Sequence, residues 1–258
     1  MTQPLTDGIN ALTRYANETT GASDQTLSDA VRTLCDGYGG GGGWSSTGIA
    51  TKSEPYGEIT LDDSVRKIAD GALNGRPITR IYAANVATAT NGACSNTELT
   101  RIEETDMPKL TSMTGGFEYC KSLTYVKLTG VVTAYSYAFR GCSNLVEAYF
   151  PNATANIDRT CNGCGKLQIM DCGSSNITNS TSFQNCTALR TLIMRKTSGV
   201  QTINAWSANC MGGIYNNPTE STIYVPQDLI SSYQADSKWS LAYNAGATFL
   251  PIEGSEYE

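Results

Sequence analysis

The sequence predicts a β-rich solenoid, in which near-identical turns of chain stack on one another, and three observations lead to that fold class. A cysteine recurs every 22 residues, with outer gaps of 26 and 24: Cys94, Cys120, Cys142, Cys164, Cys186 and Cys210. A leucine follows four of them by three residues: Leu123, Leu145, Leu167 and Leu189. Charged residues are only 16% of the 258-residue chain, which disfavours long exposed helices. One period carried by two residue types indicates stacked repeats.

Each repeat has the pattern of a short strand. Aligned on its leucine, a repeat is apolar at positions 1, 4 and 6, as at Leu123, Val126 and Leu128. This spacing predicts a strand with alternate side chains directed inward. A second apolar pair follows, as in residues 65–68 and 132–135. Three residues before the cysteine comes an aromatic or apolar residue: Phe117, Phe139, Cys161 and Phe183.

Several repeats carry a recognisable motif. Residues 139–145 (Phe-Arg-Gly-Cys-Ser-Asn-Leu) and 183–189 (Phe-Gln-Asn-Cys-Thr-Ala-Leu) resemble the leucine-rich repeats of BspA-like surface proteins, and so do residues 61–73. The resemblance covers residues 57–213. It implies a right-handed leucine-rich-repeat solenoid of about seven turns of about 22 residues, with strands on its concave side. It also implies binding more than chemistry, because this repeat serves many partners.

The first 38 residues differ from the repeats. Apolar side chains at helical spacing predict two short amphipathic helices: Leu5, Ile9 and Leu12, then Leu27, Val31 and Leu34. Such helices cannot bury enough surface alone, so we expect them to attach the chain to a partner or to oligomerise, preferably as a trimer. Residues 39–56, which begin with five glycines, predict a flexible linker. Residues 7–43 resemble the opening of minor structural proteins of tailed phages and prophages of Gram-positive gut bacteria, which implies virion attachment.

Residues 214–258 are expected to cap the solenoid, because a stack of turns ends in an apolar cross-section. Residues 222–226 predict a final strand, and residues 227–233 predict a short helix. Apolar residues at irregular spacing then supply the cap: Trp239, Leu241, Tyr243, Phe249 and Ile252.

The cysteines are expected to be reduced packing residues. The N-terminus lacks the basic and apolar regions of a secretory signal. A stacked column of six thiols needs no disulfide, because free cysteine buries as a small hydrophobe. Cys161-x-x-Cys164 together with Cys172 also permits a zinc site, but the repeat register places all three at core positions. The chain has no histidine, and the sequence predicts neither a metal nor a cofactor.

The outward strand positions form the candidate binding surface. A surface that combines tyrosines, basic residues and carboxylates suits a glycan or a protein, although an ordinary solvated sheet face has the same pattern. Tyr125 and Tyr149, in adjacent turns, are the preferred pair. The candidate ligand-binding residues are Tyr82, Arg101, Tyr125, Lys127, Glu147, Tyr149, Asp171 and Arg190.

The function expected from these features is that of a phage virion protein, a tail-fibre, baseplate or capsid-fibre subunit that binds the host surface. A net charge of −6 argues against nucleic-acid binding, and no apolar run is long enough for a membrane span. No nucleophile–base pair or phosphate loop is present, so no enzyme is predicted. The alternatives are a bacterial BspA-like surface adhesin and a glycan-degrading virion enzyme. Virion proteins and a host glycan or protein are the expected partners, and host cytoplasm the place of synthesis.

Overall fold

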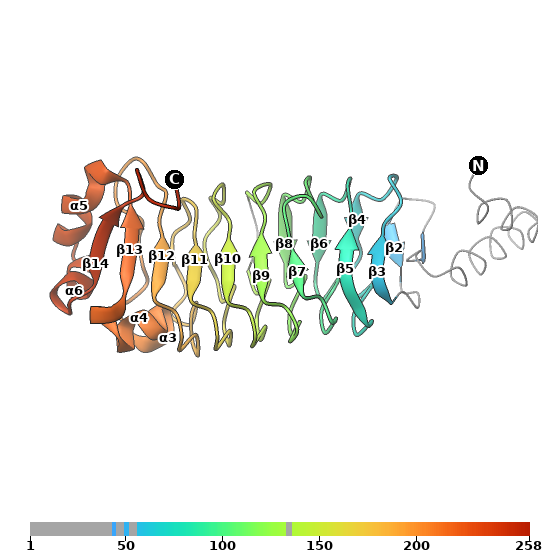
Figure 1. Ribbon diagram of the computed structural model, residues 1–258, viewed down its shortest axis with the longest axis horizontal. Coiled ribbons are helices and arrows are strands. Elements are labelled where there is room, and N and C mark those ends of the chain that lie inside the picture. The colour runs from blue at the N-terminus through green and yellow to red at the C-terminus, as the bar shows by residue number, and fades with distance from the viewer. Residues whose placement is uncertain (1–42, 45–48, 52–55, 133–135) are drawn as a thin grey trace, which may run out of the picture.

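The computed structural model describes the backbone of residues 43–44 and 49–51, and residues 56–132 and 136–258 with their side chains. Its described turns stack along one long axis (Figure 1). Residues 1–38, the expected attachment segment, lie outside the described residues, and with them Leu5, Ile9, Leu12, Leu27, Val31 and Leu34.

A long row of parallel strands forms one side of the stack. Two parallel strands come first: β3 (Gly57–Thr60) and β5 (Ile78–Tyr82). The Thr100 amide donates to the Thr79 carbonyl and links β5 to the next turn. A seven-stranded sheet then continues in chain order. Its strands are β7 (Arg101–Ile102), β9 (Tyr125–Lys127), β10 (Glu147–Tyr149), β11 (Ile169–Asp171), β12 (Thr191–Ile193), β13 (Thr222–Val225) and β14 (Thr248–Pro251).

A second sheet accompanies the N-terminal turns. Its strands, in spatial order, are β1 (Gly43–Trp44), β2 (Ile49–Thr51), β4 (Lys67–Ile68), β6 (Thr88–Thr90) and β8 (Ser112–Thr114). All neighbours are parallel except β1 and β2. Single bridges from Ile157 to Ile177 and from Ile177 to Ile203 continue the same pairing in later turns. Because β2 pairs with β4, this sheet extends into the segment that the sequence predicts as a linker.

The core contains the residues that the repeat pattern directs inward. Leu123, Val126 and Leu128 are fully buried, which confirms the inward positions 1, 4 and 6 in that repeat. The Phe117 and Phe139 rings stack with centroids 5.6 Å apart and planes at 10°. The cysteine column is also buried, as predicted. The second apolar pair is confirmed at Val65 and Ile68, which are both buried. In the later repeat the buried residue is Val131, one position before the predicted Val132, which is 39% exposed.

Short helices occur after β12, at the C-terminal end of the stack. They are α3 (Ala208–Met211), α4 (Gly213–Asn216), η1 (Pro218–Glu220), η2 (Gln227–Leu229), α5 (Ile230–Ala235) and α6 (Trp239–Asn244). Tyr233 and Trp239 are fully buried there. The Gln201 backbone ties both to the repeats, because its amide donates to the Tyr233 hydroxyl (3.0 Å) and its carbonyl accepts from the Trp239 indole (2.6 Å).

Two expectations for this end were wrong. Residues 222–226 do not form the final strand, because β14 pairs with β13 and extends the sheet further. Leu241 and Tyr243 are 48% and 47% exposed, so they do not fill the apolar end of the stack, whereas Phe249 and Ile252 are buried. Helix α6 has one buried face, which carries Trp239 and Ala242. Within the described residues, no helix combines the length and apolar character that crossing a membrane requires.

Candidate ligand-binding strand face

Strand register arranges the outward side chains in continuous columns, and we call this surface the strand face. Glu147 pairs with Tyr125 on one side and Ile169 on the other. Two positions further along the strands, Tyr149 pairs with Lys127 and Asp171 in the same way. Residues at matched positions of parallel neighbours lie about 4.8 Å apart. The outward positions predicted from the repeat pattern therefore align in columns across β9, β10 and β11.

In the earliest described turns the strand face is an internally paired network. The Arg80 guanidinium donates two hydrogen bonds to the buried Asp106 carboxylate, at 3.1 and 3.0 Å. The same guanidinium lies 5.6 Å from the Tyr82 ring centroid. The Tyr82 hydroxyl donates to Glu58 in the preceding turn (3.3 Å). Tyr82 and its charged neighbours thus satisfy one another.

The next turns bring aromatic rings together. The Arg101 guanidinium lies 4.2 Å from the centroid of the Tyr125 ring, within the range of a cation–π contact. The Tyr125 and Tyr149 rings lie 5.9 Å apart and are tilted by 49°. The Lys127 amine lies 3.9 Å from Glu104, a pair exposed to solvent that adds little stability. These contacts leave part of both tyrosine rings open to solvent.

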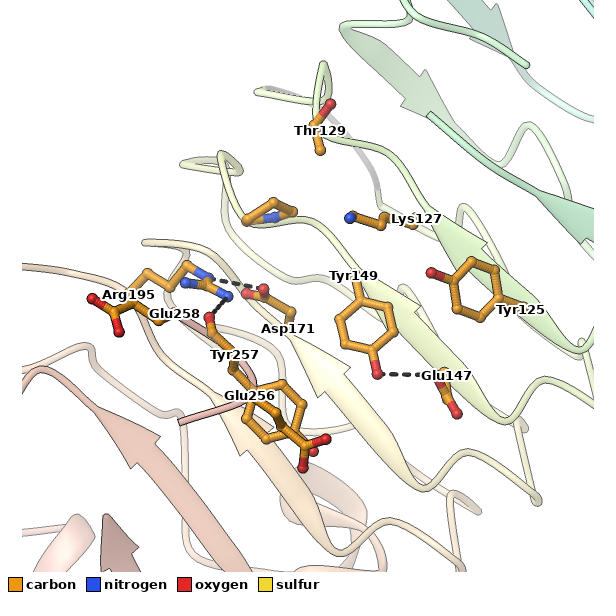
Figure 2. A pocket seen from close by; sticks show the side chains of 11 residues that line it. Tyr125, Lys127, Thr129, Glu147, Tyr149, Asp171, Arg195, Glu256, Tyr257 and Glu258 are labelled. Atoms are coloured by element: carbon orange, nitrogen blue, oxygen red, sulfur yellow. Dashed lines mark hydrogen bonds and ion pairs between the residues drawn. The ribbon is translucent and has the colours of Figure 1, made fainter. Parts of the chain in front are cut away.

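Five of the eight candidate residues line one groove with a cavity of about 380 Å³ (Figure 2): Tyr125, Lys127, Glu147, Tyr149 and Asp171. The remaining lining residues are Thr129, Pro151, Arg195, Glu256, Tyr257 and Glu258. Glu147 lies between two outward tyrosines, and the Tyr149 hydroxyl donates to its carboxylate at 2.9 Å. The groove therefore joins aromatic surface to hydrogen-bonding and charged groups.

Asp171 corrects an expectation about which residues are accessible. Its position on the outward side of β11 is as predicted, but its side chain is only 1% exposed. Arg195 donates to its carboxylate at 2.8 Å, and the Gly173 amide donates at 2.9 Å. Burial raises the pKa of Asp171, and the charge of Arg195 opposes that rise. Asp171 thus holds Arg195 in place instead of presenting a free carboxylate to a ligand.

Arg190 and Tyr82 lie apart from this groove. The Arg190 guanidinium donates to the carbonyls of Thr187 (3.0 Å) and Leu189 (2.9 Å) and pairs with Glu220 at 3.4 Å. It lines a different cavity of about 340 Å³. Tyr82 belongs to the earlier network described above. The eight candidates share one strand face but do not form one site.

The C-terminal segment is the part of the groove that sequence reasoning missed. Arg195 donates to the Tyr257 carbonyl at 2.6 Å, and the Tyr257 ring packs edge-on against Tyr224 at 4.8 Å. Figure 2 shows Glu256 and Tyr257 on the side of Tyr149 opposite Lys127. These residues lie outside the 22-residue period, so no repeat position relates them to the strands. A terminal cluster of tyrosine and glutamates is the only sequence signal.

Carboxylates dominate the electrostatics of the groove. Burial raises the pKa of Tyr149, and so does the adjacent Glu147. Burial and Glu256 raise the pKa of Tyr257 to about 12. Burial also raises the pKa of Tyr125, and Glu147 adds to the rise. The three phenols therefore stay protonated at neutral pH and serve as hydrogen-bond donors and ring surfaces.

The alternative of a zinc site finds no support in the described part of the chain. Cys161, Cys164 and Cys172 are each fully buried in the core. Among residues 56–132 and 136–258 no cluster of three or more cysteine or carboxylate side chains is placed to hold a metal ion. The three thiols occupy the packing positions that the repeat register assigns to them.

Two solved structures match this chain at low sequence identity and low TM-score. One is the pneumococcal vaccine antigen PcpA, with 10% identity, coverage of 82% of this chain and 84% of that chain, and a TM-score of 0.25. The other is a leucine-rich repeat protein from Bacteroides ovatus, with 12% identity, coverage of 76% and 84%, and a TM-score of 0.24. A comparison with curated proteins finds no match.

The family comparison identifies the repeats themselves. The family described as BspA type leucine rich repeat region matches residues 113–224 in six copies. The matched range includes strands β9 to β12, each parallel to its neighbours. The expected phage resemblance falls outside this match. Residues 113–224 are therefore a BspA-type leucine-rich repeat region with a parallel strand face.

Proposed function

We propose that this chain is a non-enzymatic recognition protein whose strand face binds a glycan or a protein on a bacterial cell surface. The observation that carries the proposal is the groove around Tyr125 and Tyr149, where two neighbouring rings lie 5.9 Å apart beside Glu147 and Lys127. Aromatic rings provide large contact area at low entropic cost, and the charged groups fix orientation.

Binding is a better account of this groove than catalysis. Glu147 already accepts a hydrogen bond from the Tyr149 hydroxyl, and Asp171 is buried against Arg195. Because each carboxylate is held by a partner inside the protein, Glu147 and Asp171 do not form a general acid and base pair. Side chains fixed in this way suit a binding surface. Leucine-rich repeats are typically binding or adhesion modules, which supports the same assignment.

The finer assignment is a virion protein, a tail-fibre, baseplate or capsid-fibre subunit, oligomerised and attached through residues 1–38, with a trimer preferred. Its support is the resemblance of residues 7–43 to minor structural proteins of tailed phages. A second candidate, a bacterial surface adhesin, is favoured by the BspA-type region at residues 113–224. Both candidates use the same strand face.

Cell binding tests the recognition function. Fluorescently labelled full-length protein is applied to a panel of Gram-positive bacterial cells and quantified by flow cytometry. Tyr125→Ala is expected to weaken binding at least tenfold on a responsive strain, because ring truncation at the centre of an interface costs about 1.4 kcal/mol or more. Tyr243→Ala removes a tyrosine that is 47% exposed and does not line the groove, and it serves as the control.

Equal binding by both variants would contradict the role of the strand face. If the purified protein releases reducing sugar from the cells, its function is glycan degradation instead of recognition alone. Mass spectrometry separates the two finer candidates: the chain is expected in purified virions, and its presence only in the bacterial envelope fraction would assign it as an adhesin.

A further inference from the structure

The repeat turn that holds Tyr149 lacks the cation that accompanies Tyr82 at the equivalent position. Residues 78–82 and 145–149 align as repeats, which places Arg80 and Glu147 at the third position and the two tyrosines at the fifth. Arg80 lies over the Tyr82 ring at 5.6 Å. The Tyr149 turn has the carboxylate of Glu147 in place of that guanidinium.

No internal cation replaces the missing guanidinium within the described residues. Among residues 56–132 and 136–258, no lysine or arginine nitrogen lies within 4.0 Å of the Glu147 carboxylate, and no such side chain stacks on the Tyr149 ring. Lys127, the neighbour in register, reaches toward Glu104 instead. Glu147 has only the Tyr149 hydroxyl as its polar partner in this part of the chain.

The groove has room for an external group at this place. Its cavity of about 380 Å³ extends from Tyr149 to the C-terminal residues Glu256 and Tyr257. Figure 2 shows Glu147 on one side of the Tyr149 ring and Glu256 and Tyr257 across from it. Rings and carboxylates thus border the same open space from two separate segments of the chain.

The charge balance of the groove selects the sign of the ligand. Its lining contains four carboxylates, those of Glu147, Asp171, Glu256 and Glu258, against the two cations Lys127 and Arg195. Asp171 and Arg195 neutralise each other at 2.8 Å. The remaining groups carry a net negative charge, which disfavours anionic ligands and attracts a cation to the tyrosine rings.

We propose that the groove binds the ammonium or guanidinium group of a lysine or arginine side chain on a partner protein, stacked on Tyr149 and paired with Glu147. The apolar stem of such a side chain packs along the tyrosine rings, while its charged head reaches the carboxylate. The open strand face on either side offers contact area for the rest of the polypeptide. This inference rests on the proposed recognition function and names the chemistry of its target.

Calorimetric titration of the full-length protein with acetyl-tetralysine amide at low ionic strength tests the proposal. Glu147→Gln is expected to weaken binding about fivefold. Glu147→Arg recreates the Arg80–Tyr82 arrangement and is expected to weaken it at least twentyfold, because the internal cation occupies the ring. Glu98→Gln removes one exposed charge outside the groove and is expected to change affinity less than twofold.

Two results would overturn the proposal. One is tetralysine affinity that is the same for the parent, Glu147→Gln and Glu147→Arg proteins. The other is binding of neutral maltotetraose, or of fully Nε-acetylated tetralysine, at least as tight as that of tetralysine, which would assign the groove to a neutral ligand. Cell binding that persists with either result leaves the recognition function intact, whereas tetralysine binding without any cell binding counts against that function alone.

Discussion

The thiol of Cys142 donates a hydrogen bond to the carbonyl oxygen of Phe117 in the preceding turn, at 3.2 Å. The same contact recurs along the stack: Cys164 donates to Phe139 at 3.1 Å, and Cys186 donates to Cys161 at 2.9 Å. Each thiol therefore links its turn to the one before. A cysteine combines a small apolar volume with a weak donor, so it fills the core and satisfies a buried carbonyl.

Substitutions at Cys142 should separate these two roles. Cys142→Val keeps apolar volume but removes the donor, and we expect it to lower the free energy of unfolding by about 2 kcal/mol, because a buried carbonyl is left unpaired. Cys142→Ser keeps a donor, so its loss of unfolding free energy should be about 1 kcal/mol smaller than that of Cys142→Val. Urea denaturation of both variants measures the difference.

Cys172 provides the matched control. It is fully buried, and within the described residues its thiol has no hydrogen-bond partner. Cys172→Val should therefore be more stable than Cys172→Ser, the reverse of the order at Cys142, because an unpaired hydroxyl is costly in the core. The same order at both positions would mean that the column is packing alone.

The repeat pattern predicts orientation well, because a stacked turn repeats the environment of the turn before it. It assigned Leu123, Val126 and the cysteines to the core and Tyr125 and Tyr149 to the outer surface. It could not predict that Asp171 is covered. That result depends on Arg195, and Arg195 in turn contacts Tyr257, 62 residues further along the chain and outside any repeat.

The same limit applies to the hydrogen bonds of the cysteine column. The 22-residue period places Cys142 in the core, but a period carries no information on whether a thiol faces a ring or a carbonyl. The direction of the Phe117 carbonyl depends on the local turn, which ends with Tyr119 at a φ of +58°. Residues other than glycine rarely adopt that backbone conformation, so the turn geometry could not be predicted from the residue types.

Arg195 is expected to control stability through Asp171. Arg195→Gln leaves a buried carboxylate without its cation, so the variant should lose about 2 to 3 kcal/mol of unfolding free energy at pH 7. Asp171 has a pKa raised above its ordinary value of 3.8, and loss of Arg195 raises it further. A carboxyl group whose folded-state pKa is raised makes the protein less stable as pH rises from 3.8 through the folded-state value.

The loss of unfolding free energy caused by Arg195→Gln should therefore be larger at pH 7 than at pH 4.5. Denaturant titrations of parent and variant at the two pH values measure it. A double variant, Arg195→Gln with Asp171→Asn, should recover part of the loss at pH 7, because the buried charge is removed as well. A deficit that does not change with pH would show that Arg195 acts through its Tyr257 contact alone.

Gly173 is expected to be a sensitive position in the turn after β11. Its φ is +55°, and a Cβ atom built there would lie 2.5 Å from the Ala153 carbonyl oxygen and 2.6 Å from that of Phe150. Gly173→Ala should therefore cost about 3 kcal/mol or more, since backbone strain and collision add. Gly199 has a φ of +72° with open space around it, so Gly199→Ala should cost only about 1 kcal/mol. Thermal melts of the two variants compare them, and equal costs would exclude the collision.

The buried thiols should make the fold sensitive to alkali. Burial raises the pKa of Cys142, Cys164 and Cys186 well above the ordinary value of 9.0. The unfolded chain then releases these protons at lower pH than the folded chain. Stability should therefore stay level through neutral pH and fall as pH rises above about 9.

Thiol labelling with a disulfide reagent checks the burial that underlies this effect. In a Cys35→Ser background the eight described cysteines are the only thiols left. They should react over hours in native buffer and within seconds in denaturant, because reaction requires a thiolate exposed to the reagent. Rapid native labelling of even one of them would mean that its turn opens frequently.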